Sequence, residues 1–170
     1  MEHLQYPVGR FLFDDKSFDL NQSIQVIKNF SDEVHSIASK LKHGKLDISY
    51  RPEGWTARQV IHHVADSHSH ALLRIKCTLS EDNPTIKPYM EDKYALLPDY
   101  KLPVESAILI LQGVHLKWAF ILENLNDDDL DREYYHPGYQ KHFTIKQATA
   151  LYDWHCSHHL GHLQICLSND

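Results

Sequence analysis

Histidine is the residue type with the clearest capacity for chemistry in this sequence. The chain of 170 residues contains 14 histidines, of which four lie between His62 and His70 and four between His155 and His162. A neutral imidazole is the commonest metal ligand in proteins, and its charge changes near neutral pH. The clustering therefore indicates a metal site.

The second histidine window is the segment W-H-C-S-H-H-L-G-H. Residues four apart share one face of a helix, so either His155 with His159 or His158 with His162 could bind a single ion. A rotation of about 100° per residue puts His155 and His159 on either side of the centre of the apolar face. On the same wheel His158 lies at the edge, and His162 points inward one turn lower. We therefore predict that His155 and His159 are metal ligands.

A third ligand is needed, because a catalytic zinc site usually has three protein ligands and keeps one open position. The first window offers four candidates in the segment I-H-H-V-A-D-S-H-S-H. On a helical wheel His68 is centred on the apolar stripe, whereas His63 lies on its flank. Periodicity alone leaves this choice open.

Two capping boxes mark the helices that carry these windows. T-A-R-Q at Thr56 starts a helix that we expect to reach Ser80, and T-I-K-Q at Thr144 starts one that we expect to reach about Leu167. Apolar residues spaced three and four apart predict two further helices, at 21–41 and 104–125.

The connections complete the predicted fold. Residues 81–103 contain four prolines, which predicts an ordered crossover without a regular element. The Pro-Gly step near residue 137 predicts a short hairpin or a loop before the last helix. Four helices with one long crossover predict an all-α fold, a four-helix bundle formed by a single domain over residues 1–170.

The histidine motifs also resemble those of a known family. G-W-T-A-R-Q-V-I-H-H-V-A-D-S-H and W-H-C-S-H-H-L-G-H, with L-Q-Y-P-V-G, N-P-T-I-K-P-Y and Y-Y-H-P, are similar to the YfiT branch of the DinB/YfiT-like metal-dependent hydrolases over nearly the whole chain. The resemblance implies a four-helix bundle with one divalent ion per chain, zinc or nickel, held by three histidines. By motif position these are His63, His155 and His159, so the resemblance favours His63 over His68.

The resemblance implies a hydrolase that acts on a small molecule through a metal-activated water. Relatives with the same bundle are thiol S-transferases that use bacillithiol or mycothiol, so a low-molecular-weight thiol is the alternative nucleophile. A metal-binding module without turnover is the third hypothesis. A zincin protease is disfavoured because Cys156, not glutamate, follows the first histidine of the last helix. No glutamate beside the ligands is evident in the sequence as a general base.

Two further polar residues could lie near the site, and a third, a histidine, is expected in the core. Asp66 could orient a ligand or accept a proton, with a surface acid as the alternative. Arg74 shares the flank of His63 and could anchor an anionic substrate group, unless it only extends its charge to solvent. His115 is expected to be a hydrogen-bonded core residue, with a contact to water or to a metal ligand as the alternative.

Composition limits the partners. The net charge of −6 and an isoelectric point near 6.1, with scattered basic residues, disfavour nucleic acid binding. We expect no membrane span, because no uninterrupted apolar run is long enough. An acidic second residue, no signal-like apolar segment and three cysteines without framework spacing favour a cytoplasmic protein. Tyr89, Tyr94 and Tyr100 in the crossover suggest an exposed aromatic surface and hence a homodimer.

Overall fold

Four long helices make up most of the protein. The computed structural model describes residues 2–41 and 44–168. The long helices are α2 (Leu20–Lys40), α3 (Ala57–Ser80), α5 (Glu105–Leu122) and α7 (Ile145–Ser168). The short elements are α1 (Glu2–Gln5), α4 (Glu91–Tyr94), α6 (Asp127–Leu130), the 3₁₀ turns η1 (Lys45–Asp47) and η2 (Pro98–Lys101), and the strands β1 (Glu133–His136) and β2 (Lys141–Thr144).

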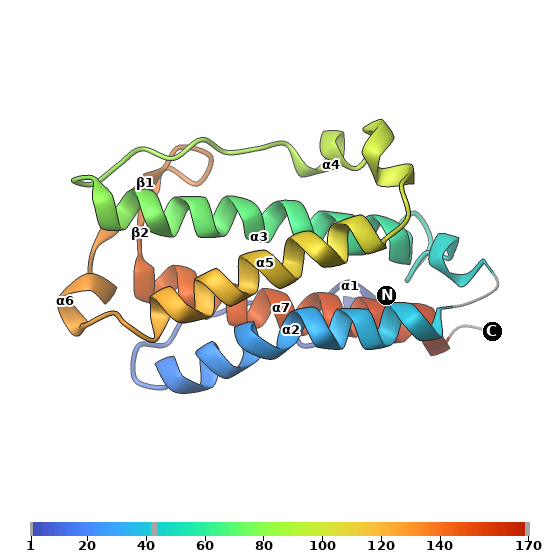
Figure 1. Ribbon diagram of the computed structural model, residues 1–170, viewed down its shortest axis with the longest axis horizontal. Coiled ribbons are helices and arrows are strands. Elements are labelled where there is room, and N and C mark those ends of the chain that lie inside the picture. The colour runs from blue at the N-terminus through green and yellow to red at the C-terminus, as the bar shows by residue number, and fades with distance from the viewer. Residues whose placement is uncertain (1, 42–43, 169–170) are drawn as a thin grey trace.

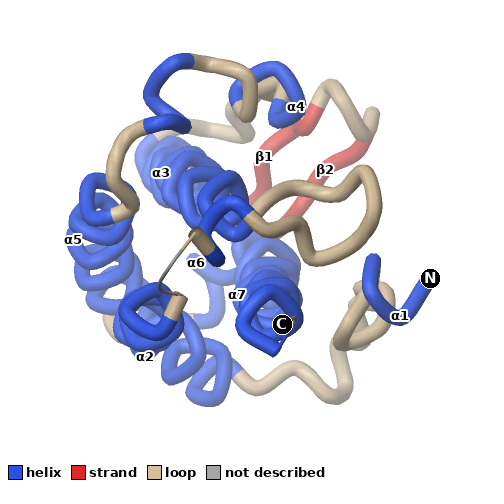
Figure 2. Tube along the Cα trace, turned by 90° about the vertical axis from the view of Figure 1, so that its right-hand side faces the viewer, coloured by secondary structure: helices blue, strands red, loops and turns tan. Residues whose placement is uncertain are grey.

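The four long helices form a bundle with a crossover, as predicted. Helices α2 and α3 each pack against both α5 and α7, so α2 and α3 lie on a diagonal (Figure 2). Helices α2 and α7 run in one direction, and α3 and α5 run in the other (Figure 1). Because α3 and α5 are consecutive and parallel, the chain between them must travel back along the bundle. The crossover segment does this, and it contains the short helical turns α4 and η2, where the prolines had predicted no regular element.

The predicted helix starts are confirmed by their caps. The Thr56 side chain accepts a hydrogen bond from the Gln59 N–H, and the Gln59 side chain accepts one from the Thr56 N–H. Thr144 and Gln147 form the same pair before α7. Helix α5 ends at Leu122, earlier than predicted, because the extended backbone of Asn126 begins the cap of α6.

The crossover is ordered, but its aromatic side chains are not an exposed surface. Tyr100 is 4% exposed, and Tyr89 stacks on His70 of α3 with ring centroids 4.3 Å apart. Tyr94 packs against both rings. The expectation of exposed tyrosines was therefore wrong, because these rings cover α3.

The Pro-Gly segment forms a hairpin, not a loop. Strands β1 and β2 pair antiparallel, with Glu133 opposite Thr144 and Tyr134 opposite Phe143. Tyr134 and Phe143 are both buried, so one face of the hairpin packs on the bundle. The hairpin, α4 and α1 all lie on the α3–α7 side of the bundle (Figure 2).

A histidine layer separates two apolar clusters along the bundle. One cluster contains Val60 and Val64 of α3 with Leu111 of α5, and the other contains Ile75 of α3 and Trp118 of α5. Between them in sequence come His68 on α3, His115 on α5 and His155 on α7, of which the first two are buried. The polar layer thus crosses the middle of the core.

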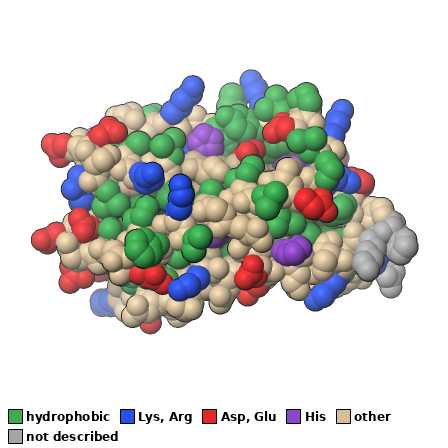
Figure 3. All heavy atoms as spheres, in the orientation of Figure 1, with side chains coloured by type: hydrophobic (Ala, Val, Ile, Leu, Met, Phe, Trp, Pro, Cys, Tyr) green, Lys and Arg blue, Asp and Glu red, His purple; other side chains and the backbone are tan. Residues whose placement is uncertain are grey.

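Helix α5 has apolar residues on both faces. Among the described helices it is the one long and apolar enough, by length and composition, to cross a membrane. The expectation of no membrane span considered only uninterrupted apolar runs, and it stays a prediction. Its inner face buries Leu111 and Trp118 in the bundle, whereas Leu109, Leu116 and Phe120 are exposed. Figure 3 shows hydrophobic side chains at the surface on this side.

Candidate metal centre

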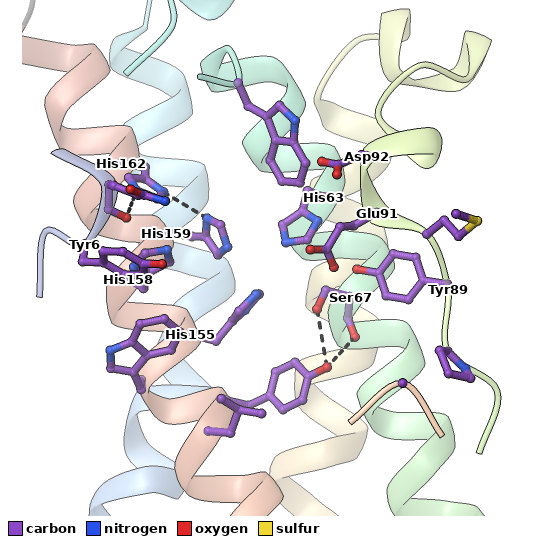
Figure 4. A pocket seen from close by; sticks show the side chains of 18 of the residues that line it. Tyr6, His63, Ser67, Tyr89, Glu91, Asp92, His155, His158, His159 and His162 are labelled. Carbon is purple, nitrogen blue, oxygen red and sulfur yellow. Dashed lines mark hydrogen bonds between the residues drawn. The ribbon is translucent and has the colours of Figure 1, made fainter. Parts of the chain in front are cut away.

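The structure brings the three predicted ligands together. His63 projects from α3 towards His155 and His159 of α7 (Figure 4). One ring nitrogen from each histidine lies within 4.8 Å of the nitrogens of the other two. The capping box of α3 fixes where His63 falls, and the four-residue spacing in α7 places the other two on one face.

The chemistry of this group fits a divalent ion. The His63 Nδ1 atom is buried and has no hydrogen-bond partner, which costs roughly 1–3 kcal/mol unless a ligand binds. Burial lowers the pKa of His63 to about 4, and it lowers the pKa values of His155 and His159 well below their usual range. All three rings are therefore neutral at pH 7 and keep a lone pair. Three imidazole nitrogens suit zinc or nickel.

His68 lies behind His155 and not beside the other two nitrogens. Its Nε2 is 2.9 Å from the His155 Nδ1, and its Nδ1 is 2.7 Å from the His115 Nε2. The Nδ1–H of His115 donates to the Ile27 carbonyl of α2. His115 is thus the hydrogen-bonded core histidine that the sequence predicted, and it connects to the candidate centre.

A second histidine group overlaps the first. One ring nitrogen each of His158, His159 and His162 also lies within 4.8 Å of the other two. Both nitrogens of His162 are already engaged, with Nε2 donating to the Gln5 carbonyl at 3.2 Å and Nδ1 lying 3.3 Å from the His159 Nδ1. The His162 ring stacks on Tyr50 at 3.8 Å. Binding at this group would break those contacts, so we take His63, His155 and His159 as the candidate centre.

The candidate centre opens onto a cavity of about 890 Å³ between α3 and α7. Trp154, which precedes His155 in α7, also lines this cavity. Several of the polar atoms on its wall are buried without a hydrogen-bond partner. They include Arg74 Nε, His136 Nδ1 and His158 Nδ1.

The other two predicted site residues lie in different places. Arg74 lines the cavity, three turns of α3 beyond His63. Asp66 is absent from the cavity wall, and its carboxylate accepts a hydrogen bond of 2.8 Å from the Tyr100 hydroxyl. Burial raises the pKa of Asp66, against a smaller lowering by Tyr100. Its role as an orienter stays a prediction, and its contact indicates a role in holding the crossover.

Several cavity residues were missed by the sequence analysis. Glu91 and Tyr89 come from the crossover, and His136 comes from the hairpin. Figure 4 shows Glu91 facing the same space as His63, where the sequence had indicated no glutamate. Burial raises the pKa of Glu91. These segments lack a helical period, so no pattern pointed to the cavity.

Comparisons with known proteins agree with this architecture. The family model of the DinB superfamily matches residues 28–163. A protein of Oceanobacillus iheyensis named "Putative metal-dependent hydrolase" is 38% identical over 169 residues, covering 98% of each chain. A protein of the same name from Bacillus cereus strain AH820 is 40% identical over 167 residues, covering 96% of this chain and 95% of its own.

A solved structure gives the same result. YfiT from Bacillus subtilis, described as "a probable metal-dependent hydrolase with an unusual four-helix bundle topology", superposes with a TM-score of 0.92 at 33% identity. The match covers 96% of this chain and 95% of that one. The sequence motifs, the parallel α3–α5 pair and these matches agree with one another. The chain belongs to the DinB superfamily.

Proposed function

We propose that this protein is a metal-dependent hydrolase of a small molecule, with one zinc or nickel ion held by His63, His155 and His159. The observation that carries the proposal is the convergence of three neutral imidazoles on the wall of an open cavity. The relatives named as metal-dependent hydrolases support it.

A divalent ion bound by three neutral imidazoles keeps its double charge and so lowers the pKa of a coordinated water or thiol. The chain's own residues orient the substrate and supply a proton acceptor. The carboxylate of Glu91 faces the space beside His63, and its raised pKa suits it to take a proton from an attacking nucleophile. Trp55, whose ring centroid is 4.6 Å from that of His63, packs against this ring and also lines the cavity.

Arg74 is the proposed anchor for an anionic group of the substrate. Its Nε atom is buried without a hydrogen-bond partner, and no ion pair within 4.0 Å involves it in the part of the chain that the structure describes. The Nδ1 atom of His136 is also unpaired, and burial, with a smaller contribution from the charge of Arg74, lowers the pKa of His136. An oxyanion would satisfy donors from both side chains.

The position of Arg74 also constrains the length of the substrate. Arg74 follows His63 by eleven positions on the same helix, which is about 16 Å at 1.5 Å per residue. Its long side chain leans back towards the helix N-terminus and shortens this span. We infer an elongated substrate with its reacting group near His63 and an anionic group near Arg74.

A thiol S-transferase is the second candidate, favoured by the size of the cavity. About 890 Å³ is near the upper end for small-molecule sites. This volume leaves room for a thiol cosubstrate beside an electrophile. A thiol would replace water as the nucleophile and use the same three histidines.

A matched assay separates the candidates. Panels of esters, amides and electrophiles are tested with and without bacillithiol, with the His155→Ala variant as the background. Ester or amide cleavage that needs metal but no thiol supports the hydrolase. Turnover that requires the thiol and saturates with it supports the transferase. No turnover in any panel favours a metal-binding module.

A further inference from the structure

A line of hydrogen bonds crosses the bundle from the candidate centre and uses one residue from each long helix. It runs from His155 on α7 to His68 on α3 over 2.9 Å, and then to His115 on α5 over 2.7 Å. It ends at the backbone carbonyl of Ile27 on α2. His68 and His115 are 0% and 1% exposed, so water does not compete for these contacts.

The last acceptor fixes the direction of every bond in this line. A carbonyl oxygen only accepts, so the His115 Nδ1 carries a proton, and its Nε2 is the acceptor in the neutral ring. His68 must then donate from Nδ1 and accept at Nε2. His155 in turn must donate from Nδ1, which leaves its lone pair on Nε2.

A second, shorter line fixes the other ligand of α7 in the same way. The Nε2–H of His162 donates to the Gln5 carbonyl, so the His162 Nδ1 is an acceptor. The His159 Nδ1 must therefore donate to it across 3.3 Å, which leaves the lone pair of His159 on Nε2. Figure 4 shows this pair beside His63.

We propose that His68, His115 and His162 are positioning residues, which hold His155 and His159 as Nδ1–H tautomers with Nε2 available to the metal. The proposal rests on the proposed metal centre. It accounts for three buried histidines that would otherwise be unexplained polar residues in the core. Each neutral imidazole has one lone pair, so the wrong tautomer would present an N–H to the ion.

His63 differs from the other two ligands. Its Nδ1 atom has no hydrogen-bond partner, and its ring is held by packing against Trp55 at a centroid distance of 4.6 Å. The proposed centre therefore combines two ligands whose tautomers are fixed by hydrogen bonds with one ligand, His63, whose tautomer no hydrogen bond at Nδ1 fixes. Loss of a fixing contact should affect the α7 ligands and leave His63 unchanged.

The direct test uses the metal-free wild-type protein at pH 7.5. Long-range ¹H–¹⁵N correlation spectra of histidine rings distinguish the two neutral tautomers. We expect His155, His159, His68 and His115 as Nδ1–H forms and His162 as the Nε2–H form. An Nε2–H tautomer at His155 or His115, or an Nδ1–H tautomer at His162, would overturn the assignment.

Paired variants test the consequence for metal binding. A glutamine at position 68 accepts through its oxygen and donates through its amide nitrogen, so His68→Gln preserves the direction of the line, whereas His68→Leu breaks it. We expect His68→Leu to weaken zinc binding about 10- to 100-fold and to give mixed tautomers at His155. His68→Gln should restore both. His162→Leu and His162→Gln should act likewise on His159, and His35→Gln, an exposed histidine of α2, is the matched control.

The outcomes separate this inference from the proposed function. Equal zinc affinity for wild type, His68→Leu and His68→Gln would overturn the positioning role even if the enzyme is active. Equal loss in His68→Leu and His68→Gln would also overturn it, because packing would then be the cause. The expected tautomers without zinc binding would support the hydrogen-bond assignment and reject the metal centre.

Discussion

The Nε2 atom of His68 lies 2.9 Å from the Nδ1 atom of His155. The histidine that the helical wheel centred on the apolar stripe of α3 is thus hydrogen-bonded to a candidate ligand and is not itself grouped with the three candidate ligands. Its central position on the wheel reflects burial, since His68 is completely buried and His63 is nearly so. Burial and metal binding favour the same face, so a helical wheel cannot distinguish a ligand from its support.

The first prediction concerns metal content. One divalent ion per chain should bind to the wild type, and His63→Ala, His155→Ala and His159→Ala should each lose it, because two imidazoles hold an ion far less tightly than three. Elemental analysis after dialysis measures this. His158→Ala is the control, because His158 belongs only to the second group. Metal retained in His63→Ala but lost in His158→Ala would move the site to that group.

Much of the fold could be predicted from the sequence because its signals are local. The capping boxes at Thr56 and Thr144 define where α3 and α7 begin within a residue, and the apolar period defines the length of each helix. The prolines indicated the crossover, which in turn requires parallel α3 and α5. The early end of α5 was missed because it depends on the cap formed by Asn126.

The site was only partly predictable because its walls come from segments without a period. His155 and His159 followed from helical spacing, and His63 followed from the family motif. Glu91 and His136 reach the cavity through the packing of the crossover and the hairpin, which no local pattern encodes. The prediction of exposed tyrosines was wrong for the same reason, because the burial of Tyr100 depends on its contact with Asp66.

The second prediction concerns metal removal. Treatment with a chelator should leave the helices intact, because two apolar clusters hold the four long helices together without the ion. Far-ultraviolet circular dichroism before and after removal checks this. The melting temperature should fall, since an ion that binds only the folded state stabilises it. Helix loss on chelation at 25 °C would instead make the ion structural.

The third prediction concerns Arg74. If this side chain binds an anionic substrate group, Arg74→Gln should raise KM for an anionic substrate by 10- to 100-fold, equivalent to roughly 1.5–3 kcal/mol for a charged hydrogen bond. The same variant should leave KM for an uncharged analogue unchanged. Exposed Lys117 on α5 provides a matched control as Lys117→Gln. Equal effects of Arg74→Gln on both substrates would contradict the assignment.

The fourth prediction concerns the homodimer, for which the tyrosines no longer supply a reason. Leu109, Leu116 and Phe120 lie on one face of α5 and are 69%, 73% and 67% exposed, an apolar surface that a second copy could cover by two-fold symmetry. Light scattering should give twice the chain mass of 19.8 kDa. Leu116→Glu should give monomers, and Leu12→Glu, far from this face in sequence, should not. A single-chain mass for the wild type at every concentration would reject the dimer.

The last prediction concerns the stability of the metal-free protein in acid. Burial lowers the pKa of His115 to about 4, and that of His63 likewise. Unfolded chains have histidine pKa values near 6.5, so below this pH the unfolded state binds more protons than the native state. Stability should therefore fall as pH decreases from about 6.5 to 4, by up to about 1.4 kcal/mol per pH unit for each such histidine.

Two carboxyl groups act in the opposite sense, so a matched variant is needed. Burial raises the pKa values of Asp66 and Glu91, which makes the native state hold their protons more tightly and favours folding in acid. His115→Gln removes one histidine whose pKa is lowered, and it retains a donor for the Ile27 carbonyl and an acceptor for His68. Urea unfolding at pH 7.5 and 5.5 should show a smaller loss of stability in this variant than in wild type. An equal loss of stability in His115→Gln and in wild type would contradict a buried neutral histidine at position 115, because that histidine must take up a proton when the chain unfolds.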